Sequence, residues 1–388
     1  MKHSELLSVA HIGAAAQFDW QLEALKKLTA IDCGSRDLEG NAKVVAIMDE
    51  LLGMIDGIKI EHHFSEGYGT HIIARLKPEN PEKKIILCGH TDTVFNPGDA
   101  AAHPFHVEGD TAYGLGIVDC KGGLLVAIGA VKALQERGLL PNYEIVFIFN
   151  CDEEIGSPSG HGVFDLEIPG ADMAFVFEPS RLENGVITAR KAACRITIDV
   201  RGKKAHAGVN YLDGRSATAE LAHKILALYK ENIDERGLQF NVGPLYGGDS
   251  GVGVVSDHAT AKVGVRVANQ ADVDTVREIV ARVEKNTFIE GTSTTISVDS
   301  VGTPMERNER NVALYQKVNA AAHLLGYDLP EQATGGGSDA SYFSAKGVAS
   351  VDGLGPYMYK MHAMDESMRL SSVTEKTELF AVVLGTLE

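Results

Sequence analysis

The 388-residue sequence lacks several features that mark large classes of protein. It has no run of about 18 or more apolar residues, so no membrane-spanning helix is expected. Its N-terminus has no basic segment followed by an uninterrupted apolar core, because Glu5, His11 and Gln17 interrupt the candidate, and no signal peptide is expected. The 5 cysteines are an odd number without a Cys-x-x-Cys pair, which favours reduced thiols and a cytoplasmic location.

Positive charge is also scarce. The chain has 36 Lys and Arg residues against 53 Asp and Glu residues, and its formal net charge is −17. This excess of negative charge argues against nucleic acids and anionic membranes as partners. It does not exclude an anionic small molecule, because bound metal ions or a local Arg can reverse the sign of the charge inside a cleft.

Strands and helices alternate in the first half of the chain. Apolar runs predict buried strands at 71–76, 84–88, 143–149 and 173–177, and apolar residues at helical spacing predict helices at 19–28, 41–52 and 124–137. This order is typical of an α/β fold with a mainly parallel sheet flanked by helices. The glycine-rich segment 113–123 resembles a phosphate loop, but it lacks the Gly-Lys-Ser/Thr ending and the dinucleotide fingerprint, which argues against nucleotide binding.

The pattern changes at about residue 191. Four alternating strands and two helices are predicted there, at 196–200, 215–229, 238–242, 259–267, 271–285 and 294–298. This content fits a small two-layer α+β insert. A helix at 311–325 and a strand at 348–351 then resume the first pattern. We therefore predict a catalytic domain in two parts, 1–190 and 302–388, with an inserted lid or dimerisation domain at 191–301.

Acidic residues and histidines gather where the predicted strands end. Three strand ends and the glycine-rich loop supply them: His90 and Asp92, Glu153 and Glu154, Glu178, and Asp119. Open α/β sheets place their chemistry at this edge. A pair of divalent ions needs a bridging carboxylate, terminal His or carboxylate ligands and an open position for water. The second imidazole must come from the C-terminal part, where His362 is the candidate.

The acidic pair Glu153-Glu154 has two possible roles. One carboxylate would bind metal while the other acts as the general base on water. A solvated acidic turn is the ordinary alternative, but the preceding strand is almost wholly apolar, which favours a functional site. A soft ligand from Cys88, Cys120 or Cys151 is a further alternative, although the nearby carboxylates are better placed.

Taken together, these motifs resemble the zinc-dependent glutamate carboxypeptidase (carboxypeptidase G-like) family, which is related to acetylornithine deacetylase, succinyl-diaminopimelate desuccinylase and aminoacylase. The resemblance covers nearly the whole chain, through 32–40, 89–94, 114–121, 152–157, 177–179, 204–208, 335–340 and His362. It implies a zinc exopeptidase-like fold with the inserted lid. It also implies a metallo-exopeptidase or amidohydrolase that cleaves an amide or peptide bond next to a free carboxylate.

The resemblance assigns a role to each residue at the sheet edge. Asp119 would bridge two zinc ions, and the ligands that complete the two ions would be His90 and Glu178 for one, and Glu154 and His362 for the other. Asp92 would orient His90. Glu153 would be the general base that generates a metal-bound hydroxide. The peptide bond between Asp119 and Cys120 would be cis.

The resemblance also places residues outside the metal site. His206, in the lid, would stabilise the oxyanion in the partner subunit's site, which implies a homodimer formed through the lid. Arg266 would bind the carboxylate of a small-molecule substrate, assisted by backbone N–H groups at Gly335, Gly336 and Gly337.

Two departures from the family pattern concern substrate recognition. Gly253 and Ser256 stand where relatives have Asn and Pro, and Thr303 stands where they have Arg. A hydroxyl does not replace a bidentate carboxylate partner, so a preference for C-terminal glutamate is not predicted. Alternatives are an N-acyl amino acid deacylase, an aryl or non-peptide amidohydrolase, or a non-catalytic metal-binding homologue. The expected metal is Zn²⁺, with Co²⁺ or Mn²⁺ open, because oxygen and nitrogen ligands discriminate poorly among these ions.

Overall fold

The structure is a computed structural model that describes residues 3–181, 184–248 and 251–387. Its chain divides into two compact units. Unit 1 comprises Met1–Thr188, Arg307–Ala333 and Ser338–Glu388, and unit 2 comprises Ala189–Glu306 and Thr334–Gly337. The insert predicted at 191–301 falls inside unit 2. Unit 2 also takes in Thr334–Gly337, which lies in the predicted second part of the catalytic domain, 302–388.

A six-stranded mixed sheet forms the centre of unit 1. Its strands, in spatial order, are β1 (Lys59–Ser65), β2 (Gly69–Leu76), β6 (Tyr143–Asn150), β3 (Lys83–His90), β7 (Met173–Val176) and β14 (Ala349–Val351). The last four run parallel to one another, whereas β1 and β2 add an antiparallel edge. Every residue of β6 is buried, as expected for a strand covered on both faces. The α/β prediction with parallel central strands is confirmed.

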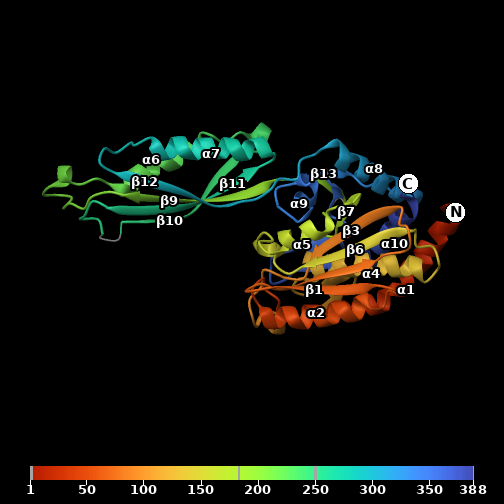
Figure 1. The fold of residues 1–388 in the computed structure, drawn as a ribbon. Coiled ribbons are helices and arrows are strands. Elements are labelled where there is room, and N and C mark those ends of the chain that lie inside the picture. Colours follow the sequence, from red (N-terminus) through yellow and green to blue (C-terminus); the bar gives the residue numbers. More distant parts are fainter. Residues whose placement is uncertain (1–2, 182–183, 249–250, 388) are drawn as a thin grey trace. The chain divides into compact units, whose positions relative to one another are not determined.

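Helices cover this sheet (Figure 1). The unit 1 helices are α1 (His3–Thr29), α2 (Leu38–Leu52), α3 (Asp99–Ala102), α4 (Gly122–Gln135), α5 (Gly160–Glu167), α8 (Glu309–Leu324), α9 (Ala340–Ala345) and α10 (Ser372–Thr386). The three helices α1, α4 and α10 pack on one another over the main core, while α5 and α9 lie against β6 and β7. α1 begins well before the predicted residue 19, because Leu6, Ala10 and Ala14 continue its buried face at a spacing of four residues.

Two small sheets complete the strands of the chain that the structure describes. One has the order β15 (Met358–Lys360), β16 (Ser367–Arg369), β5 (Thr111–Tyr113) and β4 (His106–Glu108), and the other pairs β13 (Glu331–Thr334) with β8 (Val186–Arg190). Pairing of β16 with β5 brings the segment after Tyr113 beside the segment before Ser367. The strands β4, β5, β15 and β16 were not predicted, because three residues carry too little periodicity to indicate a strand.

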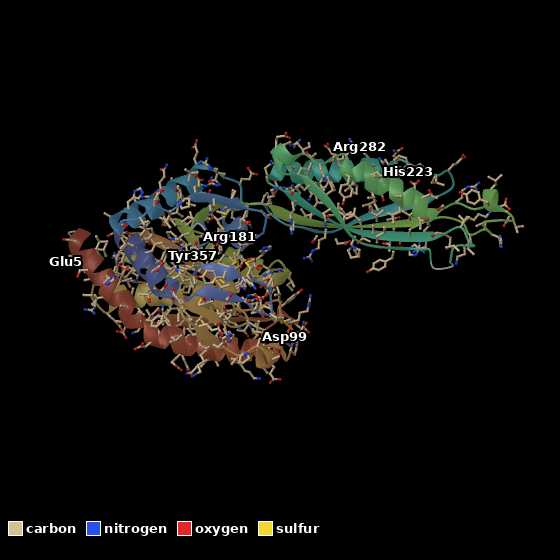
Figure 2. The ribbon with its side chains drawn as sticks, turned by 180° about the vertical axis from the view of Figure 1, so that it is seen from behind. Glu5, Asp99, Arg181, His223, Arg282 and Tyr357 are labelled. Atoms are coloured by element: carbon tan, nitrogen blue, oxygen red, sulfur yellow. The ribbon has the colours of Figure 1, made fainter. Side chains whose placement is uncertain are left out.

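Unit 2 is a four-stranded antiparallel sheet with two helices on one face (Figures 1 and 2). Its strands, in spatial order, are β10 (Gln239–Gly247), β11 (His258–Val267), β9 (Ala192–Arg201) and β12 (Ser293–Val301), and its helices are α6 (Ala217–Tyr229) and α7 (Gln270–Lys285). Figure 2 labels His223 on α6 and Arg282 on α7 in this helical layer. Alternate residues of β9 are buried against the helices, as its alternating sequence predicts. Among the described residues, no helix is both long and apolar enough to cross a bilayer.

Candidate metal centre and substrate residues

The carboxyl ends of the parallel strands in unit 1 converge on one cluster of side chains. β3 ends at His90, β6 leads into the short turn Glu153–Ile155, and Glu178 follows β7. Asp119 lies in the segment Ile117–Lys121, directly before α4. Because parallel strands end at the same edge of the sheet, these residues meet there.

Asp119 stands between two histidines. Its Oδ1 atom lies 3.1 Å from Nε2 of His90, and its Oδ2 atom lies 3.0 Å from Nε2 of His362. Each imidazole faces a second carboxylate as well, at 3.5 Å from His90 to Glu178 and 3.4 Å from His362 to Glu154. The structure therefore contains two imidazole–carboxylate clusters that share the carboxylate of Asp119.

The donor set fits a pair of divalent cations. Ligand atoms of His90, Asp119 and Glu154 all lie within 4.8 Å of one another. Oε1 of Glu154 is buried without a hydrogen-bond partner in the described part of the chain, which is costly for a carboxylate unless a cation or a proton compensates. Two neutral imidazoles and three carboxylates on such a cluster are ordinary ligands for zinc and similar ions.

Burial and the close packing of charged groups shift the pKa values of the clustered side chains. Hydrogen bonds to Asp119 and Glu154 raise the pKa of His362 to about 10. Burial opposes ionisation of Asp119, but hydrogen bonds from His362 and His90 outweigh it and lower the pKa of that carboxyl. Burial, together with the charge of Glu178, raises the pKa of Glu153 well above its usual value. Such a carboxylate binds a proton more readily than an ordinary surface Glu does.

Asp92 connects the first histidine to the acidic pair. Its Oδ1 atom lies 3.3 Å from Nδ1 of His90 and accepts the backbone N–H of Glu153 at 3.1 Å. Its Oδ2 atom accepts the backbone N–H of Glu154 at 3.1 Å and the hydroxyl of Ser35 at 2.6 Å. Asp92 thus contacts His90 and also fixes the backbone of both acidic residues. Sequence reasoning missed Ser35 in this role.

Cys120 follows Asp119 through a cis peptide bond, as the resemblance implied. Its Sγ, with ligand atoms of His90 and Glu178, forms a second group of potential ligands within 4.8 Å. However, the thiol donates to the backbone carbonyl of Phe177 at 3.1 Å, and burial, followed by the charge of Glu178, raises its pKa well above the usual value. The carboxylates are therefore the better ligands here. Cys88 and Cys151 are buried as well, and burial raises the pKa of both thiols.

The remaining predicted residues lie in unit 2. His206 is exposed, and its Nδ1 accepts the backbone N–H groups of Gly208 and Val209 at 3.1 and 3.2 Å. With Nδ1 held as an acceptor, neutral His206 carries its proton on Nε2 and can donate there. The side chain of Asn210 accepts the backbone N–H of His206 and braces the same loop.

Arg266 and the three glycines also belong to unit 2. Arg266 is an exposed residue of β11. The carbonyls of Gly336 and Gly337 accept from Nη1 of Arg190 at 3.2 and 3.0 Å. In a planar trans peptide the N–H points away from the carbonyl, so the N–H groups of Gly337 and Ser338 face away from Arg190. Sequence reasoning missed Arg190, which sets the orientation of this loop.

Comparison with known proteins identifies the family. The model of "Peptidase family M20/M25/M40" matches residues 86–386. The chain belongs to this family. It is a metallopeptidase or amidohydrolase.

Curated relatives match over most of their length. "Carboxypeptidase G2" of Pseudomonas sp. (strain RS-16) is 29% identical over 86% of this chain and 81% of the relative. "Succinyl-diaminopimelate desuccinylase" of Bradyrhizobium sp. (strain ORS 278) is 26% identical over 81% of this chain and 85% of the relative. Among solved structures, the aminopeptidase PepT from Bacillus cereus ATCC 10987 has a TM-score of 0.78 at 20% identity, and the match covers 94% of this chain and 97% of the PepT chain. This last likeness concerns the fold.

Proposed function

We propose that this protein hydrolyses an amide or peptide bond next to a free carboxylate, with two divalent metal ions and Glu153 as the general base. The observation that carries this proposal is the position of Asp119, whose two carboxylate oxygens each face a different imidazole. A carboxylate that binds a single metal ion needs to face only one imidazole ligand. A carboxylate shared between two imidazole–carboxylate clusters is suited to bridging two ions.

The proposed ligands divide between the two positions. One ion would be held by His90, Asp119 and Glu178, and the other by His362, Asp119 and Glu154. When bound, two such ions supply Lewis acidity toward the substrate carbonyl and lower the pKa of water. Zn²⁺ is the proposed metal, with Co²⁺ and Mn²⁺ able to use the same ligands.

Glu153 is the residue that moves the proton. Its backbone is fixed by Asp92, and its neighbour Glu154 contacts His362. The Glu153 carboxylate would accept a proton from the attacking water and deliver it to the nitrogen of the leaving amine. Its raised pKa suits a group that must take up a proton and then release it.

The residues of unit 2 would recognise the substrate. The Nε2–H of His206 would donate to the developing oxyanion, and Arg266 would bind the substrate carboxylate together with the N–H groups of the glycine loop. Around His206, Val209, Leu212 and Val252 are exposed at 82%, 86% and 105% of their reference areas. Apolar exposure of this kind beside His206 supports the proposal that the protein is a homodimer in which this part of unit 2 meets a second subunit.

A deacylase of N-acyl amino acids is the second candidate. Gly253 leaves it open, because glycine has no side chain to offer a substrate there although a Cβ atom at that position would meet nothing within 4 Å. Succinyl-diaminopimelate desuccinylases are among the relatives, and their name describes removal of a succinyl group. The two candidates share the metal site and the carboxylate on the amine side of the scissile bond. They differ in the acyl side, which is an amino acid residue in a peptide and a simple acyl group in an N-acyl amino acid.

A substrate panel tests the proposal. Zinc-loaded protein would be assayed with dipeptides, N-acyl amino acids and aryl amides, each with a free carboxylate and as its carboxamide, with a chelator control. We expect hydrolysis of carboxylate substrates, at least about tenfold slower hydrolysis of the carboxamides, and loss of activity in chelator. Equal rates with and without chelator, or with carboxylate and carboxamide, would contradict the proposal.

A further inference from the structure

Glu366 is a buried carboxylate that neither the ligand set nor the proposed reaction uses. Glu366 is only 1% exposed. Oε2 accepts the backbone N–H of Gly116 at 3.0 Å, and Oε1 accepts those of Val118 and Asp119 at 3.0 and 3.2 Å. A single side chain therefore satisfies three backbone donors of the segment that carries the shared carboxylate.

These contacts join two segments that lie far apart in the sequence. Glu366 is separated from Gly116 by 250 residues, yet it lies only four residues after His362. The backbone carbonyl of Glu366 also accepts the N–H of Gly114 at 3.2 Å, and the neighbouring Ser367 pairs with Tyr113 between β16 and β5. The segments of Asp119 and His362 are thus fastened to each other through Glu366.

We propose that Glu366 is a positioning residue that holds Asp119 and His362 at the separation a metal ion needs; this inference rests on the two-metal function proposed above. The backbone N–H of Asp119 is one of its three donors, so the carboxylate sets the position of the Asp119 backbone directly. His362 is linked to Glu366 by the short segment 362–366, so the position of Glu366 also restricts where His362 can lie. The 3.0 Å approach of His362 Nε2 to Asp119 Oδ2 follows from both constraints.

The chemistry of the contact distinguishes Glu from its amide. A carboxylate has only acceptors and can serve all three N–H groups, whereas an amide places its NH₂ against at least one backbone N–H. Glu366→Gln should therefore keep the size of the side chain but lose at least one of the three hydrogen bonds to backbone N–H groups. Glu366→Ala should leave all three donors without this partner.

Metal binding by the full-length protein tests the inference. Wild type, Glu366→Gln, Glu366→Ala and the control Asp365→Asn would be compared; Asp365 is exposed in the same segment and pairs with Lys360. Three quantities would be measured: metal ions per chain, the dissociation constant for Co²⁺ by chelator competition, and the visible spectrum of bound Co²⁺. Thermal unfolding of the metal-free proteins would report on the fold.

The expected result is a loss of Co²⁺ affinity of about 10- to 100-fold in Glu366→Ala, a smaller loss in Glu366→Gln, and no change in Asp365→Asn. The Co²⁺ spectrum should change in both Glu366 variants. If Glu366→Ala does not fold, Glu366→Gln decides the matter. Wild-type affinity and spectrum in folded Glu366 variants would overturn this inference alone, even if their metal-free forms are less stable. A wild-type protein that does not bind two ions would overturn the proposed function and this inference together.

Discussion

The two units hold their candidate functional residues in different ways. In unit 1 the side chains of His90, Asp119 and Glu178 are buried, and the two carboxylates lie 3.1 and 3.5 Å from the imidazole of His90. In unit 2 His206 and Arg266 are exposed, and the hydrogen bonds that orient His206 come from backbone groups of its own loop.

On the proposed function, this difference separates the metal ligands from the residues that meet the substrate. A metal pair requires ligands at fixed positions, and buried partners such as Asp92 and Glu366 supply that rigidity. Residues that receive a substrate must be accessible before it binds, so their positions depend on fewer buried contacts. Only variants of the proposed metal ligands and their buried partners in unit 1 should therefore alter metal binding. Variants in unit 2 should alter kcat or KM at unchanged metal content, and the following predictions test that separation.

The largest effect is expected for Glu153→Ala. Loss of the proposed general base should lower kcat by about 10²- to 10⁴-fold, because Glu153 is the group proposed to move the proton from water to the leaving nitrogen. The metal content should stay at two ions per chain, since Glu153 is not a proposed ligand. Steady-state kinetics and metal analysis of the same sample check both parts. Turnover like that of the wild type would exclude Glu153 as the base.

A somewhat smaller effect is expected in unit 2 for His206→Ala. Removing one oxyanion donor should lower kcat by about 10²- to 10³-fold without changing the number of bound ions. Lys204→Ala, a change to an exposed neighbour that pairs with Asp257, serves as the control. Should His206→Ala reduce the metal content instead of kcat, the proposed separation between the units would fail.

The smallest effect is expected for Arg266→Ala. Loss of a charged hydrogen bond should raise KM for carboxylate substrates by about 10- to 100-fold and leave the carboxamides unaffected. Lys262→Ala is the matched control, because Lys262 is also an exposed cation on β11. Equal changes for carboxylate and carboxamide substrates would show that Arg266 does not bind the carboxylate.

The sequence predicts the parts of this architecture that depend on short-range patterns. His90, Glu154 and Glu178 could be found because each follows an apolar strand, and strand ends in a parallel sheet share one edge. The four strands and two helices at 191–301 could be found from their periodicity. The family resemblance supplied what periodicity could not, such as the cis peptide bond after Asp119.

The supporting residues could not be predicted in this way. Ser35 contacts Asp92 across 57 residues, and Arg190 contacts Gly336 across 146. Glu366, which directly precedes the three-residue strand β16, contacts a segment 250 residues away. Such contacts depend on which distant segments the fold brings together, and a local sequence pattern does not predict that. The helix α1 was underestimated because its N-terminal half buries small residues such as Ala10 and Ala14, which give a weak apolar signal.

The most direct test of a shared carboxylate is the number of metal ions per chain in wild type and Asp119→Ala. Both proteins would be loaded with Zn²⁺, freed of excess ion by gel filtration and analysed for zinc and protein, with His206→Ala as a control from unit 2. We predict two ions per chain in wild type and in His206→Ala, and at most one in Asp119→Ala. Two tightly bound ions in Asp119→Ala, or a fully active wild type with a single ion, would contradict the account.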